Sequence, residues 1–328
     1  MSKIIIGIHG LGNKPPKEIL ESWWKQSIRE GFRKIGQPRV LFNFELVYWA
    51  DILYAEPLNL EISDPEDPLY VHEPYLPGRY SPSVKEVPLK SKLIKYLEKQ
   101  MDKLFLNADM TLNFESITDK ILHRYFKDLE TYYSAEPIMD GEGQALIRDQ
   151  IRGRLANVLV KHRNKDILLL SHSMGSIIAY DVLAHTVPHI EIDTFVTAGS
   201  PLGLPIIIGR IFAEQKKRLL DETKVLTPEN VKHAWYNFTD PEDHIAIDAT
   251  LNDDYTENSR GIRAIDMVVH TDYAVKEERN AHKSYGYLRA PEMIEILDEF
   301  LNRGKLNLLI TYQKKLNYYF SRFIEKYL

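Results

Sequence analysis

The chain has no cysteine among its 328 residues. Disulfide bonds, thiolate nucleophiles and zinc sites with cysteine ligands are therefore excluded. Long hydrophobic runs are also missing near the start, because the run at residues 4–8 ends in His-Gly and is too short for a signal peptide or a membrane span. We interpret this run as the first core strand and expect a cytoplasmic protein.

An excess of basic residues is missing too. Lysine and arginine number 42 against 47 aspartates and glutamates, which gives a formal net charge of -5. A nucleic-acid-binding surface needs positive charge to neutralise phosphates, so we expect no nucleic-acid partner. Hydrophobic residues at 44% and charged residues at 27% are ordinary for a soluble globular protein.

The known glycine motifs for phosphate groups are absent as well. Residues 3–13 are typical of a buried strand that runs into a glycine-rich turn. A helix is predicted next from apolar residues at helical spacing: Ile19, Leu20, Trp23, Trp24, Ile28 and Phe32. Dinucleotide sites share this order, but neither G-x-G-x-x-G nor the P-loop lysine motif is present, so no nucleotide cofactor is expected.

The most informative stretch is residues 166–180. Its apolar start predicts a buried strand, and the spacing from Ser176 onward predicts a helix. Ser171, Ser173 and Gly175 stand between the two, where small residues permit a sharp reversal. Ser173 would project from the apex of this turn, unless it is an ordinary turn or N-cap residue.

Further elements are predicted along the rest of the chain. Residues 40–49 are rich in β-branched and aromatic residues, which favours a strand. More strands are expected at 192–197, 233–238 and 265–269, and amphipathic helices at 147–159 and 285–301.

The turn at Ser173 resembles the nucleophile elbow of the α/β-hydrolase superfamily, G-x-S-x-G, with Ser171 in place of the first glycine. Upstream, His9-Gly10-Leu11-Gly12 resembles the H-G-x-G turn of the same superfamily, and residues 197–203 are similar to a T-x-G-S-P-L-G stretch of lipase-like serine hydrolases. The resemblance implies an α/β-hydrolase fold, with a mostly parallel central sheet, helices on both faces and a helical cap or insertion before the elbow.

The resemblance covers residues 1–54 and 145–303, which we predict to form the hydrolase core. Residues 55–144 would form a loop and a helical insertion. The loop contains an acidic run that lacks the ligand spacing of a calcium loop. The apolar stripes at 89–133 either contact substrate as a cap or pack on each other and on the sheet.

The tail at residues 304–328 is predicted to be an amphipathic helix with an aromatic face and basic flanks. Such a helix packs on the protein body, pairs two subunits or makes a peripheral contact with a membrane.

The superfamily places its acid after the strand predicted at 233–238. Asp240, Asp243 and Asp248 compete for this role. The segment Asp243-His244-Ile245-Ala246 resembles the D-x-V-[VA] turn that carries the acid, so Asp243 is the predicted acid and Asp240 the alternative. Asp240 precedes a proline, and if it is not the acid, its side chain would stabilise the loop by forming an Asx-turn. Asp248 is expected to be a plain surface residue.

The superfamily's histidine follows the last strand, and His244, His270 and His282 are the candidates. His244 adjoins the acid and is poorly placed to face it, while His270 lies close to the strand end. His282 stands in the loop before the predicted helix 285–301, which matches the position of the catalytic histidine. Ser200 is a weak rival to Ser173 as nucleophile, because proline follows it directly.

The resemblance therefore implies a triad in which Ser173 attacks, His282 accepts its proton and Asp243 orients the imidazole. It also places an oxyanion hole at the backbone N–H groups of Leu11 and Met174. The turns would be supported by His9, Gly10, Gly12 and Gly175.

The expected function is a carboxylesterase or lipase-like serine hydrolase that cleaves a small-molecule or lipid ester through an acyl-enzyme intermediate. This chemistry needs no metal or cofactor. Two alternatives stay open: a non-catalytic binding protein with an α/β-hydrolase fold, and a membrane-peripheral lipid acyl hydrolase.

Overall fold

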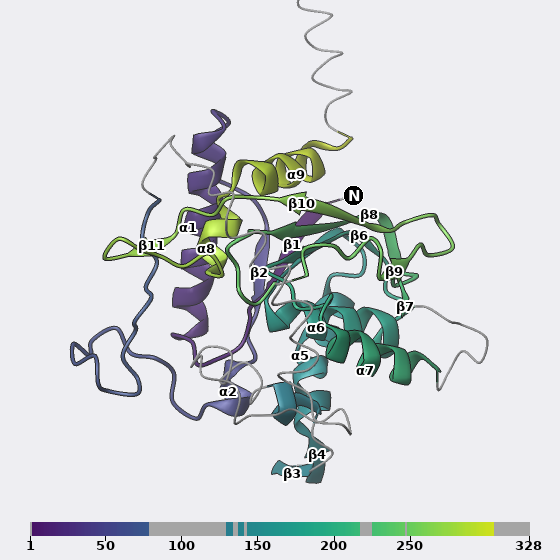
Figure 1. Ribbon diagram of the computed structural model, residues 1–328, viewed down its shortest axis with the longest axis horizontal. Helices are drawn as coiled ribbons and strands as arrows, with labels where there is room; N and C mark the ends of the chain where they lie inside the picture. The colour runs from purple at the N-terminus through teal and green to yellow at the C-terminus, as the bar shows by residue number, and fades with distance from the viewer. Residues whose placement is uncertain are drawn as a thin grey trace, which may run out of the picture.

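The computed structural model describes residues 2–78, 129–133, 137–140, 143–216, 225–246 and 248–304 (Figure 1). Most of the insertion helices predicted at 89–133, and the tail helix beyond Gly304, lie outside these residues. The cap, the membrane contact and the domain boundaries that depend on these segments therefore stay predictions.

A six-stranded sheet forms the centre of the described structure. Its strands are β1 (Lys3–Ile8), β2 (Phe44–Val47), β5 (Asp166–His172), β6 (Ile192–Ala198), β8 (Val231–Thr239) and β10 (Ala264–Val268). They lie in the order β10-β8-β6-β5-β1-β2, and each neighbouring pair is parallel. The predicted α/β class with a parallel central sheet is confirmed.

Side chains of the central strands alternate between two hydrophobic cores, as strand geometry requires. In β1, Ile5 faces one core and Ile6 the other, and in β5 the same holds for Leu168 and Leu169. All four are fully buried. Both faces of the sheet must therefore be covered by helices.

Helices cover both faces of the sheet (Figure 1). Among the described residues, α1 (Lys17–Lys34), α8 (Ser284–Leu288) and α9 (Pro291–Asn302) pack on one face, and α5 (Ile147–Lys161), α6 (Met174–Asp181) and α7 (Pro205–Lys216) pack on the other. The apolar residues of α1 explain why this helix packs on the sheet. Leu20, Trp24, Ile28 and Phe32 recur at helical spacing, so they share one side of the helix, and all four are buried. Full burial of one such side chain contributes about 1.5–3 kcal/mol.

The strand order changes direction between β1 and β5. From β1 the chain continues to β2 on one side, whereas β5, β6, β8 and β10 follow one another on the other side. In open parallel sheets, ligands bind beyond the carboxyl ends of the strands at such a switch point. The turn that begins at His9 and the turn at Ser173 follow these two strand ends.

The strand predicted at 40–49 is too long. Only Phe44–Val47 forms β2, while Val40 and Leu41 are 69% and 85% exposed. Both residues precede the segment that pairs with β1. Because both side chains are largely exposed, they gain little of the packing that stabilises a strand.

The helix predicted at 285–301 is two helices. It is interrupted before Pro291, because proline suits the first turn of a helix and disfavours helical geometry in the preceding residue. Near the end of the segment 55–144, predicted as a loop and a helical insertion, the chain forms a pair of antiparallel strands that was not predicted, β3 (Pro137–Asp140) and β4 (Gly143–Leu146).

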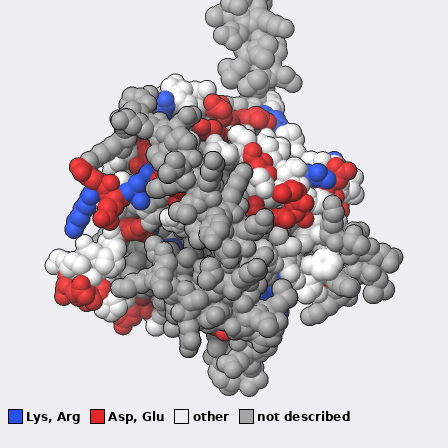
Figure 2. Space-filling model, in the orientation of Figure 1, with Lys and Arg blue, Asp and Glu red and all other residues white. Residues whose placement is uncertain are grey.

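Smaller elements border the sheet. They are the short helix α2 (Ala50–Leu53), the parallel pair β7 (Val225–Leu226) and β9 (Tyr255–Thr256), and the hairpin β11 (Ala274–Val275) and β12 (Glu278–Arg279). Acidic and basic side chains are interspersed over the described part of the face in Figure 2. Among the described helices, none is long and apolar enough to cross a membrane.

Two helical glycines test the packing of these layers. In α1, a Cβ on Gly31 would lie 2.5 Å from Cγ1 of Ile294 and 2.9 Å from Cα of Arg289. In α5, a Cβ on Gly153 would meet no described atom within 4 Å.

We predict that Gly31→Ala lowers the free energy of unfolding by about 1–3 kcal/mol through overpacking, and that Gly153→Ala raises it by up to about 1 kcal/mol through helix propensity. Urea denaturation measures both, and a Gly31→Ala variant as stable as the wild type would contradict the close packing of α1.

Candidate active site

Ser173 stands in the sharp turn between β5 and α6. Its φ of 55° and ψ of -132° are rare for a residue with a side chain and store backbone strain. Its N–H donates to the carbonyl of Ala198 over 3.0 Å, and its carbonyl accepts the N–H of Ser176 over 2.9 Å. A strained strand-to-helix turn of this kind is the geometry of a nucleophile elbow.

Glycines let the turn after β1 pack on this elbow. A Cβ on Gly10 would lie 2.6 Å from Cβ of Ser173, and a Cβ on Gly175 would lie 2.7 Å from the carbonyl oxygen of His9. Larger residues would push the two turns apart. Gly12 has a φ of 82°, a left-handed conformation that glycine adopts without a steric penalty.

Ser171, which stands where the elbow motif has its first glycine, is fully buried. Its Oγ lies 2.9 Å from the carbonyl oxygen of Val196 and 3.2 Å from Oγ of Ser176. The hydroxyl therefore has hydrogen-bond partners on β6 and α6, so its burial costs little free energy.

The structure brings the three predicted triad residues together. Nε2 of His282 lies 2.9 Å from Oγ of Ser173, and its Nδ1 lies 2.9 Å from each carboxylate oxygen of Asp243. Because an ionised carboxylate only accepts hydrogen bonds, Nδ1 carries the proton of the neutral ring. Nε2 is then free to accept the hydroxyl hydrogen of Ser173.

Asp243 is buried but remains ionised. Burial raises its pKa, but the nearby His282 outweighs this effect, together with hydrogen bonds from the N–H of Ile245 and the hydroxyl of Tyr287. The net result lowers the pKa of Asp243 from 3.8 to about 2. At neutral pH the carboxylate can therefore hold the Nδ1 proton of His282.

Asp240, the alternative acid, has different partners. Its carboxylate pairs with Arg279 and accepts the N–H groups of Thr271, over 2.6 Å, and Glu242, over 2.9 Å. The last contact is the Asx-turn expected of an aspartate before proline. The geometry favours Asp243 over Asp240 as the partner of His282.

The remaining candidates lie apart from this chain of hydrogen bonds. His244 and His270 are exposed. Ser200 is buried in the turn after β6, where its Oγ accepts the N–H of Leu202 over 3.3 Å. These three residues have no hydrogen bond to the triad among the contacts of the described residues.

His9 holds the turn that follows β1. Its Nε2 accepts the N–H of Trp49 over 3.1 Å, and its Nδ1 donates to the carbonyl of Gly10 over 2.8 Å. Burial, and then the positive charge of Lys14, lower the pKa of His9 to about 3, so the ring is neutral at neutral pH. Because a trans peptide directs its N–H away from its carbonyl, the bond to Gly10 also fixes the direction of the Leu11 N–H.

His172 directly precedes Ser173 and contacts the loop of His282. Its Nε2 donates to the carbonyl of His282 over 2.7 Å, and the two imidazole rings lie 4.9 Å apart. Burial, followed by the charge of His282, lowers the pKa of His172 well below 6.5. A neutral His172 does not oppose a positive charge on its neighbour.

Two residues of the site were not predicted from the sequence. A Cβ on Gly199 would lie 2.8 Å from Oδ2 of Asp243, and its φ is 54°. Gly199 belongs to the stretch 197–203, so a signal for it was present. Tyr287 donates to Asp243 over 2.7 Å, but no local motif indicates it, because the contact depends on how α8 meets the turn after β8.

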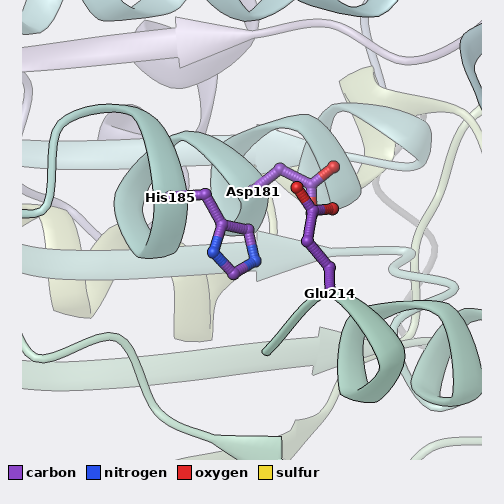
Figure 3. A group of neighbouring side chains, drawn as sticks. All are labelled: Asp181, His185 and Glu214. Atoms are coloured by element: carbon purple, nitrogen blue, oxygen red, sulfur yellow. The ribbon is translucent and has the colours of Figure 1, made fainter. Parts of the chain in front are cut away.

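A second polar cluster joins the end of α6, the short helical segment Val182–Thr186 that follows it, and α7 (Figure 3). Asp181, His185 and Glu214 place potential metal-ligand atoms within 4.8 Å of one another. However, Nη2 of Arg152 lies 2.6 Å from Asp181, and Nη1 lies 3.1 Å from Glu214. The guanidinium already supplies the positive charge that a metal would bring, so these residues fit a buried ion network better than a metal site.

A cavity of about 780 Å³ lies at the opposite end of the sheet. Lys3, Asp166 and Asp193, near the starts of β1, β5 and β6, are among its lining residues. Ser173 follows the carboxyl end of β5, so this cavity does not belong to the candidate active site.

No protein-family model matches the chain, and no curated protein matches its sequence at a significant level. The parallel sheet is compatible with an α/β-hydrolase fold. The function must therefore be argued from the geometry of the site and from the resemblance of its motifs.

The prediction that Asp248 is a plain surface residue is wrong. Asp248 is half-buried, because the turn at Gly203 packs on it, and its carboxylate accepts the N–H of Thr250 over 3.0 Å. Burial raises its pKa. Asp248 belongs to an acidic loop that also contains Asp253 and Asp254.

Asp254 gives this loop a pH-dependent stability. Burial, and then the charges of Asp248, Asp253 and Asp266, raise the pKa of Asp254 from 3.8 to about 7. Its Oδ2 is buried without a hydrogen-bond partner in the described part of the chain. Between pH 3.8 and about pH 7, Asp254 keeps its proton in the folded state but has lost it in the unfolded state. The free energy of unfolding therefore falls as the pH rises through this range.

We predict that Asp254→Asn increases the free energy of unfolding at pH 8, with a gain that shrinks as the pH falls toward 4. Urea denaturation at several pH values measures the difference. Glu257→Gln, which removes an exposed carboxylate three residues away, is the control and should show no such pH trend. A gain that is largest at low pH would contradict the raised pKa of Asp254.

Proposed function

We propose that the protein is a serine hydrolase that cleaves a carboxylic ester. The observation that carries this proposal is the hydrogen-bond chain from Ser173 through His282 to Asp243, with 2.9 Å at each step. The residues follow the chain order Ser, Asp, His of the α/β-hydrolase superfamily. Serine is a poor nucleophile at its normal acidity, and a neighbouring base is what activates it.

In the first half of the proposed reaction, Oγ of Ser173 attacks the ester carbonyl carbon while its proton passes to Nε2 of His282. The negative charge of Asp243 stabilises the imidazolium that forms. His282 then gives the proton to the leaving alkoxide, which departs as an alcohol and leaves an acyl group on Ser173. Water repeats these steps in the second half, releases the carboxylic acid and restores the serine.

The oxyanion of each tetrahedral intermediate would bind between the N–H groups of Leu11 and Met174. Met174 is the first residue of α6, where a helix leaves N–H groups without an intrahelical partner. The Leu11 N–H belongs to the peptide that His9 orients. Losing one such donor costs on the order of 10²–10³ in rate, so the orientation of these N–H groups matters for catalysis.

The choice of an ester over an amide or a thioester rests only on the resemblance to the α/β-hydrolase superfamily, whose members commonly cleave esters. The non-catalytic alternative differs in a measurable way, because a binding protein would not react covalently at Ser173. A fluorophosphonate probe therefore decides between the two functions.

We predict that Ser173→Ala lowers the turnover of a p-nitrophenyl ester by about 10⁶, the typical loss when a triad nucleophile is removed. The wild type should form a fluorophosphonate adduct at Ser173, located by mass spectrometry. Ser200→Ala is the matched control, because it removes another buried hydroxyl from a turn after a strand of the same sheet, and it should keep both reactions. Circular dichroism checks that each variant is folded. An adduct absent from the wild type, or more than a few per cent of activity in Ser173→Ala, would exclude the proposal.

The two aspartates should separate in activity and stability. Asp243→Asn is expected to lower turnover by about 10⁴, because an amide no longer holds the required imidazole tautomer. Asp240→Asn should keep most of the activity but lower the free energy of unfolding by about 1–3 kcal/mol, since it weakens the buried contacts with Arg279 and Thr271. Ester hydrolysis and urea denaturation test both variants, and the opposite pattern would make Asp240 the acid.

A further inference from the structure

The carboxylate of Asp243 has hydrogen-bond donors other than His282. The N–H groups of Ile245 and Ala246 donate over 2.9 and 3.3 Å, and the hydroxyl of Tyr287 donates to Oδ2 over 2.7 Å. The first two come from the backbone of the loop that carries the acid. Tyr287 comes from α8 and is the only side chain among the three.

The hydroxyl of Tyr287 is fixed by a second hydrogen bond. Its oxygen accepts the backbone N–H of Asp240 over 2.9 Å. A tyrosine hydroxyl has one hydrogen, so this hydrogen is directed at Asp243. Tyr287 is 1% exposed, and burial, followed by the charge of Asp243, raises its pKa well above 10. It therefore acts as a neutral donor throughout the pH range of an ester assay.

The same hydroxyl joins both ends of the turn that carries the acid. It bonds the backbone of Asp240 at one end and the side chain of Asp243 at the other, and the N–H of Asp243 donates to the carbonyl of Asp240 over 2.9 Å. The Asp240 carboxylate is in turn paired with Arg279 on β12. Tyr287 thus fixes where the carboxylate stands relative to the loop of His282.

The titratable and charged groups around this hydroxyl come from four elements. Asp240 and Asp243 follow β8, His282 lies in the loop before α8, His172 ends β5 with its ring 6.1 Å from that of Tyr287, and Arg279 lies on β12. Arg279 is already paired with Asp240 and Glu242. The hydrogen bond from Tyr287 to Asp243 is therefore a contact whose strength can be changed without removing a charge from the site.

We propose that Tyr287 is a positioning residue that holds the Asp243 carboxylate toward His282 and moderates its basicity. This inference rests on the proposed hydrolase function. A hydrogen bond from the hydroxyl withdraws charge from the carboxylate and so weakens its attraction for an imidazolium. When the bond is lost, the carboxylate is less restrained but attracts the protonated ring more strongly.

Tyr287→Phe should therefore lower kcat/KM for a p-nitrophenyl ester by about 10-fold, mainly through kcat. It should also move the acid limb of the pH dependence of kcat/KM to higher pH, by about half a pH unit. Tyr255→Phe is the matched control. It also removes a buried hydroxyl, which donates to the carbonyl of Leu202 over 3.0 Å, and it should leave the pH dependence unchanged.

Phenylalanine also leaves the N–H of Asp240 without its acceptor, so Tyr287→Phe can lose stability. Replacement of Tyr287 by 3-fluorotyrosine avoids this problem, because it keeps both hydrogen bonds and makes the hydroxyl a stronger donor. The acid limb should then move in the opposite direction, to lower pH.

An acid limb that stays in place in both variants would overturn the inference, whether or not activity falls, because a merely structural tyrosine changes activity without moving the pH dependence. A shift in the same direction for both variants would overturn it as well. Failure of the proposed function is distinguishable, since it appears in the wild type as the absence of ester hydrolysis and of a fluorophosphonate adduct at Ser173.

Discussion

The close contact between the turn after β1 and the turn after β5 is the constraint on which the candidate site depends. The two strands are neighbours in the sheet, so their following turns must share a small space. Gly10 and Gly175 have no room for a Cβ, and Ser173 adopts a positive φ to leave its strand and start α6. This contact places the serine hydroxyl beside the peptide groups of the first turn, where they would bind an oxyanion.

Around this contact, the buried polar groups differ in charge for identifiable reasons. His9 and His172 are neutral because burial penalises the charged ring and each ring has a neutral hydrogen-bond partner. Asp243 is charged because His282, two backbone N–H groups and Tyr287 compensate for burial. In the proposed reaction, a positive charge on His282 would therefore meet the negative charge of Asp243 and no buried cation at His9 or His172, which would favour proton transfer from Ser173.

Much of the fold could be predicted because its signals are local. The runs in β1 and β5 are apolar on both faces, which is the pattern of a strand buried between two helical layers, and the stripe in α1 has helical spacing. The errors also have physical reasons. Val40 and Leu41 precede the segment that pairs with β1 in the described structure and are largely exposed, so they gain little packing. The β3–β4 hairpin lies in a segment with little hydrophobic pattern.

The sequence by itself determined the order of the chemical groups: a glycine turn after the first strand, a serine elbow, an acid and a histidine, each recognisable within a few residues. Only the tertiary structure showed that Asp243 contacts His282 whereas Asp240 contacts Arg279, because both aspartates follow β8 and each partner lies 39 residues farther along the chain. It also revealed Tyr287, whose contact with Asp243 joins α8 to the turn after β8. Contacts between segments far apart in the chain are set by the packing of the sheet and its helices, and no local pattern contains them.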